Sequence, residues 1–69
     1  MPLTFATIGD ENIIKKVGGK VETKQFLEKL GFVVGGIVTV ISENNGNVIV
    51  NVKDSRIAIS KEMANKITV

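Results

Sequence analysis

Two runs rich in Val and Ile, Gly36–Ser42 and Asn47–Lys53, in which Val recurs at every second position, flank the tetrapeptide Asn44-Asn45-Gly46-Asn47. Alternation with a period of two is typical of strands that bury one face, and Asn-Gly between two such runs is a strong β-hairpin signal. Strands of this kind need further strands or a helix against their apolar face, because a hairpin alone is barely stable in water. The sequence therefore predicts a fold built around an antiparallel hairpin.

The length of the hairpin loop decides which side chains share a face, because a shift of one residue turns every side chain over. A two-residue loop would place Val40 opposite Asn51, whereas a three-residue loop, Asn44–Gly46, places Val40 opposite Val50. In the longer loop Gly46 takes the left-handed bulge position that such loops favour. We favour the three-residue loop because it gathers five valines on one face: Val38, Val40, Val48, Val50 and Val52.

Polar or glycine-rich turns divide the rest of the chain into short elements. A tight turn is expected at Asp54-Ser55, and Ser60 is a candidate N-cap for a single helical turn through Ala64. Further short strands are predicted at Asn12–Val17, Arg56–Ser60 and Ile67–Val69. About five short strands with one short α-helix favour a mainly β fold that closes into a small barrel.

The α-helix is predicted at Lys24–Leu30, with Thr23 as its N-cap and Gly31 as a left-handed residue at its C-terminus. Phe26 and Leu30 lie four residues apart on one face, with Leu27 at the edge of that face. Two helical turns are not stable in isolation, so this apolar face must dock on the sheet. Leu27 is then expected at the rim of the contact.

The composition is that of one small domain, 1–69, that depends on apolar packing. The chain contains 43% hydrophobic residues and neither Cys nor His, so disulfides are absent and so are imidazole and thiolate metal ligands. The lack of Cys is consistent with a reducing compartment. No segment has the roughly 18 apolar residues of a membrane span, and the first residues lack the pattern of a signal peptide. A cytoplasmic location is therefore expected.

The inventory of reactive side chains gives catalysis and cofactors few candidates. Nucleophiles paired with His or Cys cannot form, and the adjacent carboxylates Asp10 and Glu11 would point to opposite sides of a strand. The glycine-containing stretch from Gly31 to Gly36 lacks the Lys-Ser/Thr that completes a phosphate-binding loop. We therefore expect no enzyme activity, no cofactor and no metal site.

The charge pattern also bears on the class of partner. Nine basic and seven acidic residues give a formal net charge of +2, and no long run carries a single sign. Nucleic-acid-binding domains show clustered Lys and Arg, and barrels that bind single strands stack bases on aromatic side chains. The aromatic residues here are three Phe. Binding of nucleic acid is therefore not expected, although a small nucleic-acid-binding barrel remains the alternative.

Apolar residues outside the predicted valine face are candidates for a protein contact. In the favoured register, three isoleucines occupy the opposite face, and exposed contiguous apolar surface marks interaction sites. The curvature of the barrel, the helix or a terminus could instead cover them. With Leu27 at the helix rim and Phe32 after the helix, the candidate partner-binding residues are Leu27, Phe32, Ile37, Ile41 and Ile49.

The stretch from Phe26 to Gly35, Phe-Leu-Glu-Lys-Leu-Gly-Phe-Val-Val-Gly, resembles the helix-to-strand signature of the FeoA family. In that family a Leu-Gly-apolar segment precedes Pro-Gly and a strand, and Val34 stands here where Pro is common. Further landmarks agree in order and spacing, so that the resemblance covers essentially the whole chain: Leu3, Ala6, Gly9, Ile14, Gly18, Gly19, Ile57, Ile59, Ala64 and Ile67.

The resemblance implies an SH3-like barrel and an accessory role in ferrous iron uptake. It implies that the partner is the cytosolic GTP-binding domain of a FeoB-type membrane transporter, without direct insertion of this chain into the membrane. A weak homo-oligomer is compatible with it. The same barrel resembles the C-terminal domain of DtxR-type iron-dependent repressors, which makes a small nucleic-acid-binding or regulatory barrel the alternative function.

Overall fold

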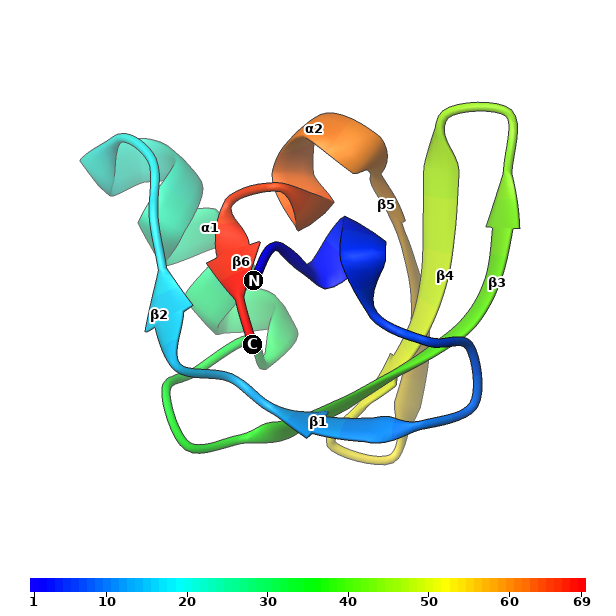
Figure 1. Cartoon of the computed structure of the whole chain (residues 1–69). Helices are drawn as coiled ribbons and strands as arrows, with labels where there is room; N and C mark the ends of the chain where they lie inside the picture. The colour runs from blue at the N-terminus through cyan, green and yellow to red at the C-terminus, as the bar shows by residue number, and fades with distance from the viewer.

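Six strands and three short helical segments make up the fold (Figure 1), a computed structural model that describes residues 1–69. In chain order they are the 3-10 turn η1 (Leu3–Phe5), β1 (Glu11–Ile13), β2 (Lys16–Val17), α1 (Val21–Leu30), β3 (Ile37–Asn44), β4 (Asn47–Val52), β5 (Ser55–Ser60), α2 (Lys61–Ala64) and β6 (Ile67–Thr68). Four strands form an antiparallel sheet in the order β1-β3-β4-β5, and β2 pairs with β6. The predicted mainly β architecture is confirmed, with one strand more than expected.

The additional strand arises because the predicted strand Asn12–Val17 is divided between the two sheets. β1 pairs with β3, and β2 pairs with β6. Between them, the amide of Ile14 donates to the carbonyl of Gly36 at 2.9 Å, and the amide of Lys15 donates to the carbonyl of Thr68 at 2.7 Å. The chain thus crosses from one sheet to the other at Ile14, whose side chain is fully buried between them.

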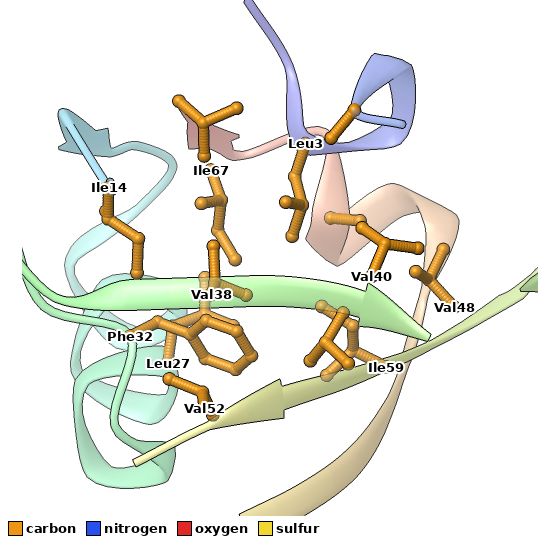
Figure 2. Close-up of a cluster of buried hydrophobic side chains, with 14 of the residues drawn as sticks. Leu3, Ile14, Leu27, Phe32, Val38, Val40, Val48, Val52, Ile59 and Ile67 are labelled. Carbon is orange, nitrogen blue, oxygen red and sulfur yellow. The ribbon is translucent and has the colours of Figure 1, made fainter. Parts of the chain in front are cut away.

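A single cluster of 15 buried apolar residues fills the space between the sheets and α1. The five valines of the predicted face all belong to it, which confirms that prediction. Leu3 from η1 and Ile67 from β6 reach the same cluster from other parts of the chain (Figure 2). No buried side chain is polar or charged, so apolar contact is the whole of the core.

The helix differs from the prediction at its start and in its buried face. α1 begins at Val21, and its N-cap residue Lys20 makes no side-chain capping bond, so the expectation for Thr23 was wrong. Leu27 is fully buried and Phe26 is 49% exposed. The side chains that face the core are Thr23, Leu27 and Leu30, at the i, i+4, i+7 spacing of one helical stripe. Leu27 is therefore the centre of the contact and not its rim.

The end of α1 agrees with the prediction. Gly31 has φ of 111°, in the left-handed region, and its amide donates to the carbonyls of Glu28 and Leu27. The amide of Phe32 also donates to the carbonyl of Leu27, at 3.0 Å. These bonds turn the chain sharply back toward the sheet, and the side chain of Phe32 enters the core directly after the helix (Figure 2).

The β3–β4 hairpin has the predicted register but reaches it by a different route. Val38 lies opposite Val52 and Val40 opposite Val50, as expected. Asn44 pairs with Asn47, so the loop has two residues, Asn45 and Gly46, and the predicted three-residue loop was wrong. A bulge between Val40 and Ser42 adds one residue to β3 and offsets the shorter loop.

The other two local predictions concern β5 and α2. Val52 pairs with Ser55, so the tight turn is Lys53-Asp54 and not Asp54-Ser55. Both turn residues have positive φ, 48° and 64°, as the type I′ hairpin geometry requires. The N-cap prediction for Ser60 is confirmed, because the amide of Met63 donates to its hydroxyl oxygen at 3.2 Å.

We expect Gly46→Ala to destabilise the fold by about 1 kcal/mol, because Gly46 has φ of 89° and a Cβ disfavours that conformation. Chemical unfolding followed by circular dichroism measures the change. Gly18→Ala is the matched control, since Gly18 lacks a positive φ and its added Cβ meets nothing closer than 3.4 Å. Equal stability losses in both variants would contradict the turn geometry.

Candidate partner-binding site

The outer face of the four-stranded sheet carries a polar row that crosses all four strands. Glu11 of β1 lies opposite Thr39 of β3, which lies opposite Asn51 of β4. Asn51 in turn lies opposite Arg56 of β5. Cross-strand partners share a face of the sheet, so these four side chains form one continuous line with a carboxylate at one end and a guanidinium at the other.

Apolar residues lie on either side of this polar row. On one side, Ile13 of β1 is directly opposite Ile37 of β3, and the two are 59% and 52% exposed. On the other side, Ile41 and Ile49 lie at the bulge and are half-buried. The three isoleucines expected to form one patch are thus divided, and the more exposed part is the pair Ile13–Ile37.

A shallow groove of about 410 Å³ adjoins the Ile13–Ile37 pair. Ile37 is the only apolar side chain in its lining, and three charged residues surround it, Glu11, Lys53 and Asp54. The remaining lining residues are Gly35, Thr39 and Asn51. An apolar side chain ringed by charged and polar groups matches the anatomy of protein contact sites, in which a polar rim encloses an apolar centre.

Two of the predicted site residues do not lie on any surface. Leu27 and Phe32 have no exposed area, so the expectation that they are accessible to a partner was wrong. The helix docks through Leu27, and the Gly31 turn directs Phe32 inward. Whether Ile37, Ile41 and Ile49 bind a partner stays a prediction, and the structure adds Ile13 to their face.

The sequence analysis missed Ile13 because Ile13 and Ile14 are adjacent and only one of them can face outward. Which of the two faces outward depends on how β1 pairs with β3, and that pairing joins residues distant in the sequence. The buried neighbour Ile14 is the residue at which the chain changes sheets. A strand of three residues is too short for its apolar pattern to show which isoleucine faces outward.

A second hollow of about 340 Å³ lies beside η1 and α2. Its lining residues are Thr4, Phe5, Glu43, Lys61 and Asn65. The hydroxyl of Thr4 donates to the side-chain oxygen of Asn65 at 2.7 Å, which links η1 to the residue after α2. Phe5 is 73% exposed at this rim. No sequence signal pointed to this hollow.

The side chains form no group of three or more His, Cys, Asp or Glu residues placed to hold a metal ion. No helix of the structure has the length and apolar character needed to cross a membrane.

A family model described as the FeoA domain matches residues 1–69. The chain belongs to the FeoA domain family. The family resemblance read from Phe26–Gly35 and the spaced landmarks is thereby confirmed.

Among FeoA-domain relatives, a protein of Methanocaldococcus jannaschii named "Putative Fe(2+) transport protein A" is 41% identical over 68 residues, covering 99% of this chain and 83% of the relative. A crystal structure of an iron uptake regulatory protein, FeoA, has a TM-score of 0.88 at 26% identity and covers 97% of this chain and 91% of its own. Zinc-complexed FeoA of Stenotrophomonas maltophilia, described as an SH3 domain protein, has a TM-score of 0.86 at 21% identity and covers 100% and 88%. The expected SH3-like fold is confirmed.

The FeoA-type barrel also occurs inside a larger protein of another class. A manganese-dependent transcriptional repressor matches with a TM-score of 0.87 at 13% identity, over 97% of this chain and 39% of the repressor. At that identity the likeness concerns the fold alone.

Proposed function

We propose that this FeoA-domain chain is a cytosolic accessory protein of ferrous iron transport that acts by binding, without catalysis, the cytosolic GTP-binding domain of a FeoB-type membrane transporter. The observation that carries the proposal is the family match over the whole chain, with a relative named for Fe(2+) transport at 41% identity. The iron is the cargo of the partner in this proposal, which suits a chain without His or Cys.

We infer that the contact surface is the outer face of the sheet, centred on Ile13 and Ile37 and extending to Ile41 and Ile49. Two exposed isoleucines on adjacent strands present apolar area that water covers in the free chain. The adjoining groove supplies charges of both signs, from Glu11 and Asp54 and from Lys53. Charges at the rim orient a partner, while burial of the central isoleucines contributes the affinity.

The test is the affinity of the chain for the isolated cytosolic portion of the transporter, measured by calorimetry without membranes. We expect Ile37→Ser to weaken binding by about 2 kcal/mol, roughly thirtyfold, because a central apolar anchor is lost. Ile13→Ser, on the neighbouring strand, should have an effect in the same direction. Folding should be unaffected because both side chains are more than half exposed.

Val21→Ser is the matched control, since Val21 is 70% exposed on α1, away from the sheet. Unchanged affinity in folded Ile13 and Ile37 variants would place the contact elsewhere. Absence of any binding to the transporter, together with oligonucleotide binding that falls steeply with salt, would instead favour the nucleic-acid-binding alternative.

A further inference from the structure

The two-stranded sheet and the start of α1 bring together lysines that are dispersed in the sequence. Lys16 pairs with Thr68, and the amide of Gly18 donates to the carbonyl of Lys66 at 2.7 Å. Val17 and Ile67, which lie between these positions, are buried, so Lys16 and Lys66 share the outer face of this sheet. Lys66, from the strand β6 side of this sheet, thus adds a charge beside Lys16.

The same surface continues onto α1. A Cβ placed on Gly19 would lie 3.1 Å from Cδ of Lys66 and 3.5 Å from the side chain of Thr23, so the Lys66 stem lies beside Gly19, close to the start of the helix. Lys20 is the N-cap residue of α1, and the amide of Lys24 donates to the carbonyl of Lys20 at 2.9 Å, one turn later. Figure 1 shows β2 beside β6 and the chain continuing from β2 into α1.

We call this surface the basic patch: Lys16, Lys20, Lys24 and Lys66. It holds four of the eight lysines of a chain whose formal net charge is only +2. All four are exposed, and none of them takes part in the side-chain and terminal hydrogen bonds of the structure. The nearest carboxylates on α1 are Glu22 and Glu28, which leaves the patch with an excess of positive charge.

The shape and the apolar content of the basic patch limit its partner. Both hollows of the molecule lie elsewhere, at the outer sheet face and beside η1. Val21, which lies between Lys20 and Lys24 in the sequence at the start of α1, is 70% exposed. The partner must therefore accept a positively charged surface that has no pocket and that carries an exposed apolar side chain beside its lysines.

We propose that the basic patch binds the surface of an anionic lipid bilayer. Lipid headgroups move laterally and can gather around four flexible lysines without a matching pocket, whereas fixed carboxylates on a protein favour the planar fork of Arg. Val21 would gain by entering the boundary between headgroups and acyl chains. Against a nucleic-acid backbone the same valine would gain nothing, and the patch offers no aromatic side chain for stacking.

The inference does not depend on the transporter contact, because the basic patch and the Ile13–Ile37 face belong to different sheets. If both hold, weak binding to the bilayer would raise the local concentration of the chain near a membrane partner. The two surfaces can be tested separately, since vesicle binding requires no transporter and the transporter assay requires no membrane.

The test is co-sedimentation of the chain with vesicles of pure phosphatidylcholine and with vesicles that contain about one-third phosphatidylglycerol. We expect binding to the anionic vesicles only, and weaker binding as salt is raised. The triple variant Lys16→Gln, Lys20→Gln, Lys66→Gln should lose about a hundredfold in affinity, from about 1 kcal/mol for each lysine. Val21→Ser should lose roughly fivefold while its net charge is unchanged.

The matched control is the triple variant Lys53→Gln, Arg56→Gln, Lys61→Gln, which removes the same charge from other faces of the molecule. It should bind anionic vesicles nearly as well as the parent. Equal losses in the two triple variants would mean that net charge alone acts, and equal binding to neutral vesicles would remove the electrostatic basis. Tighter binding to a short DNA duplex than to anionic vesicles would assign the basic patch to nucleic acid. Each of these three results overturns the proposal.

Discussion

Val50→Asp should leave the chain unfolded at room temperature. Val50 has no exposed area and lies between Val40 of β3 and Ile57 of β5. A carboxylate there has no polar partner, because the core holds no polar side chain, and burying it costs several kcal/mol. A chain of 69 residues has a total stability of only about 3–10 kcal/mol, so the loss is of the same size as the whole.

Asn51→Asp is the control for Val50→Asp, because it places the same carboxylate one residue further along β4 on the exposed face. Its thermal unfolding curve, followed by circular dichroism, should resemble that of the parent. A cooperative transition in Val50→Asp at the parent's midpoint would show that the register of the β3–β4 hairpin is wrong.

Phe32→Ala should destabilise the fold by about 3–5 kcal/mol, because it removes the largest of the fully buried side chains and leaves a cavity. Phe32→Leu should cost much less, since most of the volume is retained. Chemical unfolding of the two variants gives the comparison.

Comparison of Phe32→Ala with Phe32→Leu also distinguishes a role of Phe32 in the core from a role at the surface. Folded Phe32→Leu should bind the transporter's cytosolic portion as the parent does, since Phe32 has no area to offer a partner. Parent-like stability of Phe32→Ala combined with lost binding would return Phe32 to the contact surface, where the sequence analysis had placed it.

The elements that were predicted correctly depend on local signals. Gly31 ends α1 in the left-handed conformation, and Ser60 caps α2 through its hydroxyl, because both requirements concern a few consecutive residues. The valine face of the β3–β4 hairpin was found because valines recur at every second position in both strands. For the same reason Ile37 was correctly placed on the exposed face of the sheet.

The features that were missed depend on tertiary contacts. Leu27 faces the core because of where the sheet lies relative to α1, and the spacing of Phe26, Leu27 and Leu30 allowed either side of the stripe to be buried. The pairing that exposes Ile13 and the gathering of Lys16 with Lys66 both join distant segments. A chain with scattered charges in sequence can therefore still be electrostatically uneven in space.

The bulge in β3 also bears on how the length of this hairpin can change. On the loop side of the bulge, the cross-strand pairs have the register that the two-residue turn sets, from Ser42 opposite Ile49 to Asn44 opposite Asn47. On the other side of the bulge, the pairs have the register that places valine opposite valine in the core. Loss of Ile41 would join the two halves as a regular ladder with all pairs preserved, whereas a deletion elsewhere in β3 would turn side chains over. Single-residue deletions among relatives should therefore concentrate at Ile41, which makes this position a natural point of divergence in an otherwise length-constrained strand.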